Sequence, residues 1–233
     1  MKITILHGAF LPVPAIRGGA IVKAWDALGQ EFARTGNKVT QISRRCDGLA
    51  EEEWIDGVRH LRVNGFDSVR NPMLLKIKEF FYIWRVKKVL PYADILVTHA
   101  FWAPILISNK KYGKMYVHVG RYPKGQFKFY SNAGRFQVPT RAIKKALNRE
   151  IPYRARSVSV LPYPLDWKVD SRDNFSGRPQ NILYLGRIHE EKGVFELVHA
   201  FKNISLPDRK GWKLVIRGPW RTEQGGGGRK VFI

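Results

Sequence analysis

Residues 181–193 have the sequence NILYLGRIHEEKG, and this stretch predicts the fold class of the chain. The run 181–185 is short and almost wholly apolar, as expected of an interior parallel strand that helices cover on both faces. Gly186 ends the run and starts a turn. Helical spacing then resumes at Val194, Leu197, Val198 and Phe201. Strand, loop and helix in this order predict an α/β fold.

Two cations follow the strand of this unit. Ligands of such units bind beyond the carboxyl end of the strand, where the free N–H groups and positive dipole end of the next helix favour an anion. Arg187 lies in the loop, and Lys192 lies at the helix start beside Gly193. Arginine offers a planar fork for two phosphate oxygens, and lysine adds a compact charge. The residues predict a phosphate or diphosphate site, and a pair of solvated loop cations is the alternative.

The pattern Gly186-Arg187, four residues, Lys192-Gly193 resembles the donor-phosphate motif of the retaining glycosyltransferases of family 4. The resemblance implies that Arg187, Lys192 and Gly193 hold the diphosphate of a nucleotide-sugar donor. It also implies the two-domain GT-B fold, in which a Rossmann-like N-terminal domain with a parallel sheet precedes a second Rossmann-like domain.

The N-terminal residues predict a βαβ unit. A strand is expected at 2–7, and a helix follows the pair Gly18-Gly19, with Ile21, Trp25, Leu28 and Phe32 on one face. This pair is not the Gly-x-Gly-x-x-Gly pattern of dinucleotide-binding folds, so a Rossmann dehydrogenase is disfavoured. In family 4 a Gly-Gly turn lets backbone amides approach the donor phosphates, and Gly18 and Gly19 match it. A plain tight turn is the alternative.

Two predicted strands in the middle of the chain end near a histidine. His99 follows the run 94–100 and His118 follows the run that starts at Met115. His118 resembles the family 4 histidine that faces the transferred sugar and the acceptor, and His99 is a further candidate on the acceptor side. A hydrogen-bonded structural histidine is the alternative for both.

A long polar loop is expected over 121–135, with basic and aromatic residues interleaved. Its Arg121 and Lys124 are candidates for the acceptor side, because their charge suits a phosphorylated or lipid-linked acceptor. The aromatic residues suit stacking on a sugar face. The same mixture suits single-stranded nucleic acid, where stacking tolerates any sequence.

A helix is predicted from Met73 to Leu90, opened by Pro72. Its apolar residues fall on one side and its cations border them, which allows two interpretations. One is a basic amphipathic surface for anionic lipid. The other is a crossover helix that packs on the sheet and has a solvated basic edge. The residues concerned are Met73, Ile77, Phe80, Phe81 and Trp84, with Lys76, Lys78, Arg85, Lys87 and Lys88.

The domain prediction has three parts. Residues 1–168 form an acceptor-side Rossmann-like domain, 169–180 a polar linker, and 181–233 part of a nucleotide-sugar (donor) domain. The last part holds about one βαβ unit, whereas a compact domain usually needs upward of roughly 100 residues. It also lacks the acidic motif that family 4 enzymes carry later in this domain. We therefore expect the chain to be truncated in its second domain.

Composition limits the classes of function. An apolar content of 44% excludes a disordered chain, and 41 Lys and Arg against 19 Asp and Glu give a net charge of +22, so anions are the expected partners. Cys46 is the single cysteine, which excludes an internal disulfide and a multi-cysteine metal site.

The longest apolar tract, 95–107, is shorter than the roughly 20 residues of a membrane-spanning helix. His7 and two prolines interrupt the first apolar run, so a strand is expected there and not a signal peptide.

The resemblance implies transfer of a sugar from a nucleotide-sugar donor to a saccharide or lipid-linked acceptor with retention, as in cell-surface polysaccharide or glycolipid synthesis. His118, Arg187 and Lys192 would be the catalytic residues. No cofactor and no metal are expected, since cations neutralise the leaving group and no Asp-x-Asp motif occurs. We expect a cytoplasmic protein, with the inner face of the plasma membrane as a candidate place of peripheral attachment.

Two rival functions stay open. One is a non-catalytic remnant that binds phosphate or an anionic membrane. The other is a basic nucleic-acid-binding protein, but the sequence contains no recognised nucleic-acid motif, so nucleic acid is not an expected partner.

Overall fold

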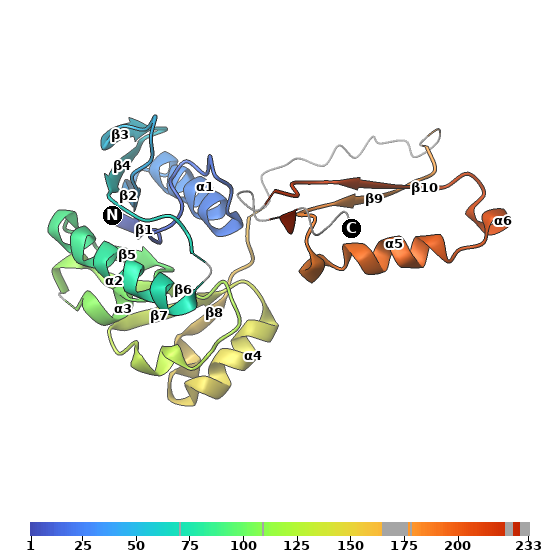
Figure 1. Cartoon of the computed structure of the whole chain (residues 1–233). Helices are drawn as coiled ribbons and strands as arrows, with labels where there is room; N and C mark the ends of the chain where they lie inside the picture. The colour runs from blue at the N-terminus through green and yellow to red at the C-terminus, as the bar shows by residue number, and fades with distance from the viewer. Residues whose placement is uncertain (70, 109, 165–176, 178, 222–225, 229–233) are drawn as a thin grey trace. The chain divides into compact units, whose positions relative to one another are not determined.

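The computed structural model describes residues 1–69, 71–108, 110–164, 177, 179–221 and 226–228 (Figure 1). The chain divides into two compact units, Met1–Asp166 (unit 1) and Trp167–Ile233 (unit 2). The linker predicted at 169–180 lies largely outside the described residues. The two units are described separately below.

Unit 1 is built on an eight-stranded sheet with the order β3-β4-β2-β1-β5-β6-β7-β8. All neighbouring strands are parallel except β3, which pairs antiparallel with β4 at the edge of the sheet. A mostly parallel sheet of this kind confirms the predicted α/β class. The strands are β1 (Lys2–Leu6), β2 (Lys38–Arg44), β3 (Glu52–Ile55), β4 (Val58–Val63), β5 (Ile95–Thr98), β6 (Lys114–His118), β7 (Ala133–Val138) and β8 (Val158–Val160).

Helices cover both faces of this sheet (Figure 1). Successive strand residues point to opposite faces, so Ile5 packs with Trp25 of α1 on one side and Leu6 packs in the cluster that contains Ile83 of α2 and Leu147 of α4 on the other. The helices of unit 1 are α1 (Ala20–Arg34), α2 (Pro72–Val89), α3 (Ala103–Leu106) and α4 (Arg141–Glu150), with short 3-10 turns η1 (Lys110–Tyr112), η2 (Gln126–Phe129) and η3 (Pro152–Ser157).

Local sequence fixes where these helices begin. The Asn71 side chain accepts hydrogen bonds from the backbone of Met73 and Leu74, and Pro72 takes the first helical position of α2. Thr140 caps α4 in the same way, because its hydroxyl oxygen accepts from the Ile143 amide at 3.2 Å. The predicted start of α2 at Pro72 is confirmed.

Three expectations for unit 1 are wrong in detail. The sequence of 45–72 indicates a single strand at 58–63 in an otherwise irregular segment, yet β3 pairs with β4 inside it. The polar loop expected over 121–135 ends early, because β7 begins at Ala133. Phe127 and Tyr130, expected to stack on a ligand, are instead buried in the core. The turn η2 places them inward, since burying aromatic rings stabilises the fold more than exposing them.

Unit 2 contains the predicted strand, loop and helix. Its parallel pair joins β9 (Asn181–Leu185) to β10 (Lys213–Arg217), and between them lie η4 (Glu190–Lys192), α5 (Val194–Lys202) and α6 (Leu206–Arg209). The expectation that β9 is covered on both faces is wrong for the described residues, because Leu183 and Leu185 are mostly exposed. Leu183 and Leu185 are two residues apart, so their side chains lie on the same face of β9. None of the helices described in unit 2 covers that face.

No helix in the described part of the chain is long and apolar enough to span a bilayer.

Candidate functional site

The strand order of unit 1 locates a ligand-binding edge. The chain runs from β1 outward through β2 and β4, and then returns to the opposite side of β1 to form β5. Ligands of open α/β sheets bind at the carboxyl ends of the strands where the order reverses in this way. His7 and Gly8 follow β1, His99 follows β5, and His118 ends β6. We call this region the carboxyl edge.

His118 is held by hydrogen bonds on both ring nitrogens. Its Nδ1 lies 3.0 Å from Oε1 of Gln137, and Gln137 donates through Nε2 to the Leu161 carbonyl at 3.1 Å. An amide oxygen only accepts, so Nδ1 of His118 carries the proton. Nε2 is then the acceptor, and the Tyr163 hydroxyl donates to it at 2.8 Å. Gln137 and Tyr163 therefore fix the orientation and tautomer of the ring.

The surroundings of His118 keep it neutral. Burial lowers the pKa of its imidazole below the ordinary value, so the ring is uncharged at pH 7. The Trp25 ring of α1 packs edge-on at 5.6 Å between centroids. At Gly120 a Cβ atom would lie 2.6 Å from Cδ1 of Ile21 and 3.0 Å from Nε2 of His118, so only glycine allows this close approach. The predicted position of His118 at a strand end is confirmed, and its role toward a sugar stays a prediction.

His99 and His7 extend the row of imidazoles along the carboxyl edge. Nε2 of His99 accepts a hydrogen bond from the Gly8 amide at 3.3 Å, and its ring lies 5.4 Å from that of His7. His7 donates through Nε2 to Oε1 of Gln41 at 2.8 Å. Burial lowers the pKa of His7 to about 4 and that of His99 well below its ordinary value. The sequence analysis treated His7 only as an interruption of the first apolar run, although its place at a strand end was visible.

Glu79 of α2 is a further group at this edge, and sequence reasoning missed it. Burial raises the pKa of its carboxyl group to about 7, and a hydrogen bond with the backbone of Phe101 only partly offsets this. Its Oε1 would lie 3.7 Å from a Cβ atom on Gly8. The carboxyl edge therefore presents neutral imidazoles and a carboxyl group whose pKa burial raises to about 7.

The Gly18-Gly19 pair lies at the start of α1, as predicted. Both residues have positive φ, 78° and 104°, and a Cβ atom on Gly19 would lie 2.6 Å from Cδ1 of Leu11. The Gly18 amide donates to the Ala15 carbonyl at 2.9 Å, so this amide is already used within the turn. Gly19 caps α1 without a side-chain hydrogen bond, and the first turn of the helix contains no acid. The free amides at the start of α1, together with the positive end of its dipole, are therefore the groups that can attract an anion here.

Arg121 and Lys124 are both exposed on the loop that follows β6. That loop is fixed at its far end, because the Glu150 carboxylate accepts hydrogen bonds from the amides of Gly125 and Phe127. The two cations lie on this loop, three and six residues after His118. Their role toward an acceptor stays a prediction.

The cations of unit 2 lie where the sequence predicted them, in the turn between β9 and α5. Close contact of two glycines shapes the turn, since a Cβ atom on Gly218 would lie 1.7 Å from the carbonyl oxygen of Gly186. The Tyr184 hydroxyl donates to the Arg187 carbonyl at 2.7 Å. Lys192 ends η4, and Gly193, with φ of 67°, leads into α5. Because the units are described separately, this loop and the carboxyl edge of unit 1 are two separate candidate sites.

Acidic side chains already contact the positive groups of this loop. Glu191 forms an ion pair with Arg187, and this guanidinium is the main cause that lowers the pKa of the Glu191 carboxyl group. Lys192 and His189 lower it further. Near the start of α5, Oε2 of Glu196 would lie 3.7 Å from a Cβ atom on Gly193. An incoming phosphate would therefore compete with the Glu191 carboxylate for Arg187.

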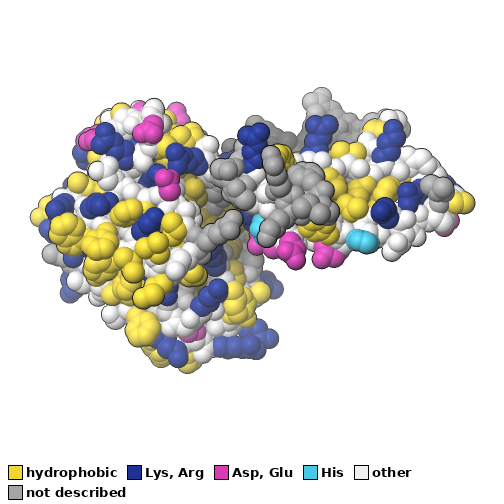
Figure 2. Space-filling view, in the orientation of Figure 1, with side chains coloured by type: hydrophobic (Ala, Val, Ile, Leu, Met, Phe, Trp, Pro, Cys, Tyr) yellow, Lys and Arg dark blue, Asp and Glu magenta, His cyan; other side chains and the backbone are white. Residues whose placement is uncertain are grey.

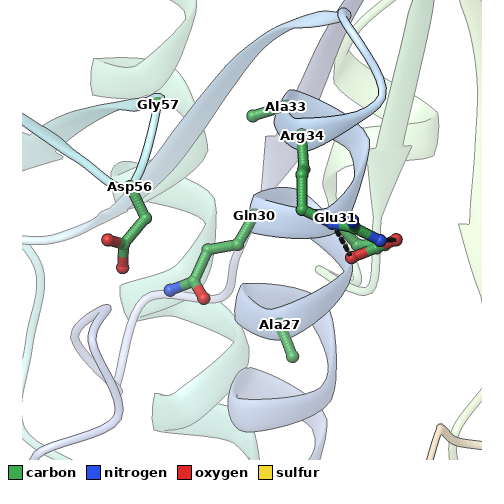
Figure 3. A pocket seen from close by; sticks show the side chains of 7 residues that line it. All are labelled: Ala27, Gln30, Glu31, Ala33, Arg34, Asp56 and Gly57. Carbon is green, nitrogen blue, oxygen red and sulfur yellow. Dashed lines mark hydrogen bonds and ion pairs between the residues drawn. The ribbon is translucent and has the colours of Figure 1, made fainter.

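A hollow of about 450 Å³ lies elsewhere, between α1 and the β3–β4 turn. Figure 3 shows Gln30 and Asp56 extending toward it, while Arg34 turns aside to pair with Glu31. This hollow is at the amino edge of the sheet, because Asp56 precedes β4 and Arg34 ends α1. It is thus separate from the carboxyl edge. Among the described residues, no three His, Cys, Asp or Glu side chains are grouped to hold a metal ion.

Comparison with known proteins shows the fold. No family model and no curated protein sequence matches the chain. Among solved structures, the sucrose-phosphate synthase of Thermosynechococcus elongatus is similar over 99% of this chain and 65% of its own, with a TM-score of 0.67 and 16% identity. The α,α-trehalose 6-phosphate synthase of Burkholderia multivorans is similar over 95% and 64%, with a TM-score of 0.66 and 12% identity.

The lipopolysaccharide outer core galactosyltransferase WaaB is similar over 93% of this chain and 60% of its own, with a TM-score of 0.57 and 16% identity. The chain thus spans about three fifths to two thirds of the length of these structures. They are GT-B glycosyltransferases, so the GT-B-like, Rossmann-like fold predicted from the sequence is confirmed.

Proposed function

We propose that this chain takes part in glycosyl transfer from a nucleotide sugar to a saccharide or lipid-linked acceptor with retention at the anomeric carbon, as the resemblance to family 4 implies. The observation that supports this most is the β9–α5 loop, in which Arg187 and Lys192 stand ahead of a helix start. In the GT-B fold, such a loop in the second unit accompanies an acceptor edge in the first.

In the proposed mechanism, the bond between the sugar and the diphosphate breaks through an oxocarbenium-like transition state. Negative charge then grows on the leaving diphosphate, and Arg187, Lys192 and the amides at the start of α5 stabilise it. The leaving phosphate accepts the proton of the acceptor hydroxyl. These cations replace the neutralising role of a divalent metal, so the proposal includes no metal cofactor.

On the acceptor side, the proposal assigns His118 a positioning hydrogen bond. Its neutral Nε2 can accept from a substrate hydroxyl once the Tyr163 hydroxyl moves away. Arg121 and Lys124 would attract the phosphate of a lipid-linked acceptor. A cytoplasmic location is part of the same proposal, because a reducing compartment suits the free, buried Cys46.

The test is calorimetric titration of the purified chain with UDP, GDP and ADP, followed by assay of nucleotide release from UDP-glucose, GDP-mannose and ADP-glucose. Removing either loop cation, by Arg187→Ala or Lys192→Ala, is expected to weaken diphosphate binding on the order of tenfold. Lys202→Ala, at the far end of α5, is the matched control and should bind as the parent does. If Lys192→Ala binds the nucleoside diphosphates as tightly as the parent does, Lys192 is not part of the donor site.

A further inference from the structure

Helix α2 has an uncovered apolar face. Its packed side consists of Tyr82, Ile83 and Val86, each with none of its surface exposed. The opposite side carries six apolar residues whose surfaces are 36% to 72% exposed. We call these six residues the α2 outer face: Met73, Leu74, Ile77, Phe80, Phe81 and Trp84.

This arrangement shows that α2 packs on the sheet, as the crossover interpretation predicted, but through other residues than expected, and the lipid interpretation remains a prediction. Both sides of α2 are apolar, and successive residues turn about 100° around the helix axis. The residues expected to pack on the sheet in the crossover interpretation are the exposed ones, and a second apolar set packs in their place. A continuous exposed apolar stripe of this kind on a soluble domain marks a contact surface.

Cations border the stripe on both sides. At helical spacing, Lys76 and Lys87 flank one edge, and Lys78 and Arg85 flank the other. Lys88 extends over the Trp84 ring with Nζ 4.1 Å from its centroid. Glu79 is the only acid of the helix, and it is turned toward the core. The α2 outer face therefore has no acid of its own to neutralise these charges.

Aromatic residues of the next loop continue the surface. Phe80 packs edge-on against Trp102 at 5.5 Å, and the Trp102 indole donates to the Lys76 carbonyl at 2.7 Å. Trp102 in turn contacts Phe101 at 5.1 Å. Figure 2 shows the resulting mixture of hydrophobic and basic side chains over the part of unit 1 where Figure 1 draws α2 and α3.

We propose that the α2 outer face docks unit 1 on an anionic lipid bilayer. The 18-residue helix, about 27 Å long, lies parallel to the membrane plane. Its apolar stripe enters the boundary of the acyl chains, and the flanking lysines and Arg85 remain among the headgroups. A bilayer supplies both the apolar layer and the negative charge that this face lacks.

A second copy of the chain fits this face less well. In a symmetric dimer the same patch meets itself, so the flanking cations of the two copies would face each other. Like charges in that arrangement repel, and the net charge of +22 adds to the repulsion. Charge complementarity therefore favours the lipid surface.

Docking through α2 also positions the candidate site. Glu79, in the first half of α2, lies beside Gly8 at the carboxyl edge. The bilayer would thus lie close to the edge that holds His99 and His118. This consequence rests on the proposed function, and it selects a lipid-linked acceptor over a soluble saccharide.

The test is sedimentation of the whole chain with vesicles, which does not depend on transfer activity. Vesicles of phosphatidylcholine with 30% phosphatidylglycerol should bind the chain, and pure phosphatidylcholine should bind it at least tenfold more weakly. Ile77→Ser/Phe81→Ser/Trp84→Ser should lower binding to the anionic vesicles on the order of tenfold or more. Circular dichroism of this variant checks that α2 still folds. Unchanged binding by the folded variant would overturn the proposal.

A charge-matched pair of variants separates docking from general attraction. Lys76→Glu/Lys87→Glu alters the border of the stripe, whereas Arg141→Glu/Lys145→Glu makes the same charge change on exposed positions of α4. The first should lower vesicle binding about tenfold and the second about twofold at most. Equal losses would overturn the proposal, as would sedimentation equilibrium showing a dimer that the serine variant abolishes. Nucleotide binding by the vesicle-binding variants reports on the proposed function independently.

Discussion

Strand β1 of unit 1 and strand β9 of unit 2 both lead through a glycine-containing turn into a helix, but their surroundings differ. β1 has a neighbouring strand on each side and helices on both faces of its sheet. Among the described residues, β9 has one neighbour, β10, and an exposed face. The carboxyl edge of unit 1 is therefore held by packing and neutral hydrogen bonds, whereas the loop of unit 2 is held by turns and a charged pair. Substitutions should affect stability in the first and binding in the second.

The largest expected effect comes from one substitution made at equivalent positions. Leu6 ends β1 with none of its surface exposed, and Leu185 ends β9 with 76% exposed. Leu6→Ala leaves a cavity and should cost about 2–5 kcal/mol of unfolding free energy. Leu185→Ala should change it by at most about 0.5 kcal/mol. Hydrogen exchange, read by mass spectrometry on peptides of each strand, measures both changes in unfolding free energy. Comparable losses of free energy in the two variants would contradict this prediction, because they would show that β9 is covered in solution.

A second difference concerns one carboxyl group in each unit. Burial raises the pKa of Glu79 from 4.5 to about 7, so its contribution to stability is present below pH 4.5 and is lost as the pH rises through 7. At 1.36 kcal/mol per pH unit, this loss is about 3 kcal/mol. Glu79→Gln should remove that part of the pH dependence. The pKa of Glu191 is lowered by a cation at an exposed position, so its contribution to stability is present above pH 4.5, is lost only as the pH falls below that value, and is screened by solvent. Glu191→Gln should therefore leave the loss of stability between pH 4.5 and pH 9 as it is in the parent.

Urea denaturation of the parent and both variants at pH 4 and pH 9 measures this effect. The parent should lose about 3 kcal/mol more than Glu79→Gln between these two values. His7 and His60, whose pKa values burial lowers to about 4, destabilise all three proteins in acid and cancel in the difference. A parallel pH profile for Glu79→Gln would mean that this carboxyl group is hydrated in solution.

A smaller effect is expected at the hydrogen bond between Tyr163 and His118. Tyr163→Phe leaves Nε2 of His118 without its donor, which should cost about 1 kcal/mol. The Nδ1-protonated tautomer should persist, because Gln137 still accepts from that nitrogen. Nitrogen-15 NMR of the imidazole reports the tautomer, and 1 M salt should not alter the cost because both partners are neutral. A shift of the proton to Nε2 would show that Tyr163, and not Gln137, sets the tautomer.

Most of the fold was visible in the sequence because it follows local rules. Apolar runs predicted β1, β5, β6 and β9, and Pro72 predicted the start of α2. The edge strand β3 was missed because its sequence, EEWI, is half charged and shows no apolar alternation. Its backbone pairing with β4 holds it in the sheet. Which side of α2 packs was undecidable locally, since both sides are apolar.

The candidate site was predictable in position more than in chemistry. Strand ends and glycine turns predicted where Gly19, His118 and Arg187 lie relative to the strands and helices, and their roles remain predictions. The raised pKa of Glu79 depends on burial by residues distant in sequence, so no local pattern indicates it. The ion pair of Arg187 with Glu191 has the i, i+4 spacing of helical pairs and was visible in the sequence, but attention to the cations alone missed it.

The smallest expected effect tests whether charge alone holds the donor loop. Glu191 competes with an incoming diphosphate for Arg187, and an exposed ion pair of this kind is weak because solvent screens it. Glu191→Gln should therefore strengthen UDP binding about two- to threefold at low salt, measured by calorimetry. Glu190→Gln, at the exposed neighbouring position, makes the same charge change without that pair and should have a smaller effect. The gain should vanish at 1 M salt, because screening weakens the competing pair. Weaker binding by Glu191→Gln would reverse the assignment, because it would mean that Glu191 orients Arg187 for the phosphate.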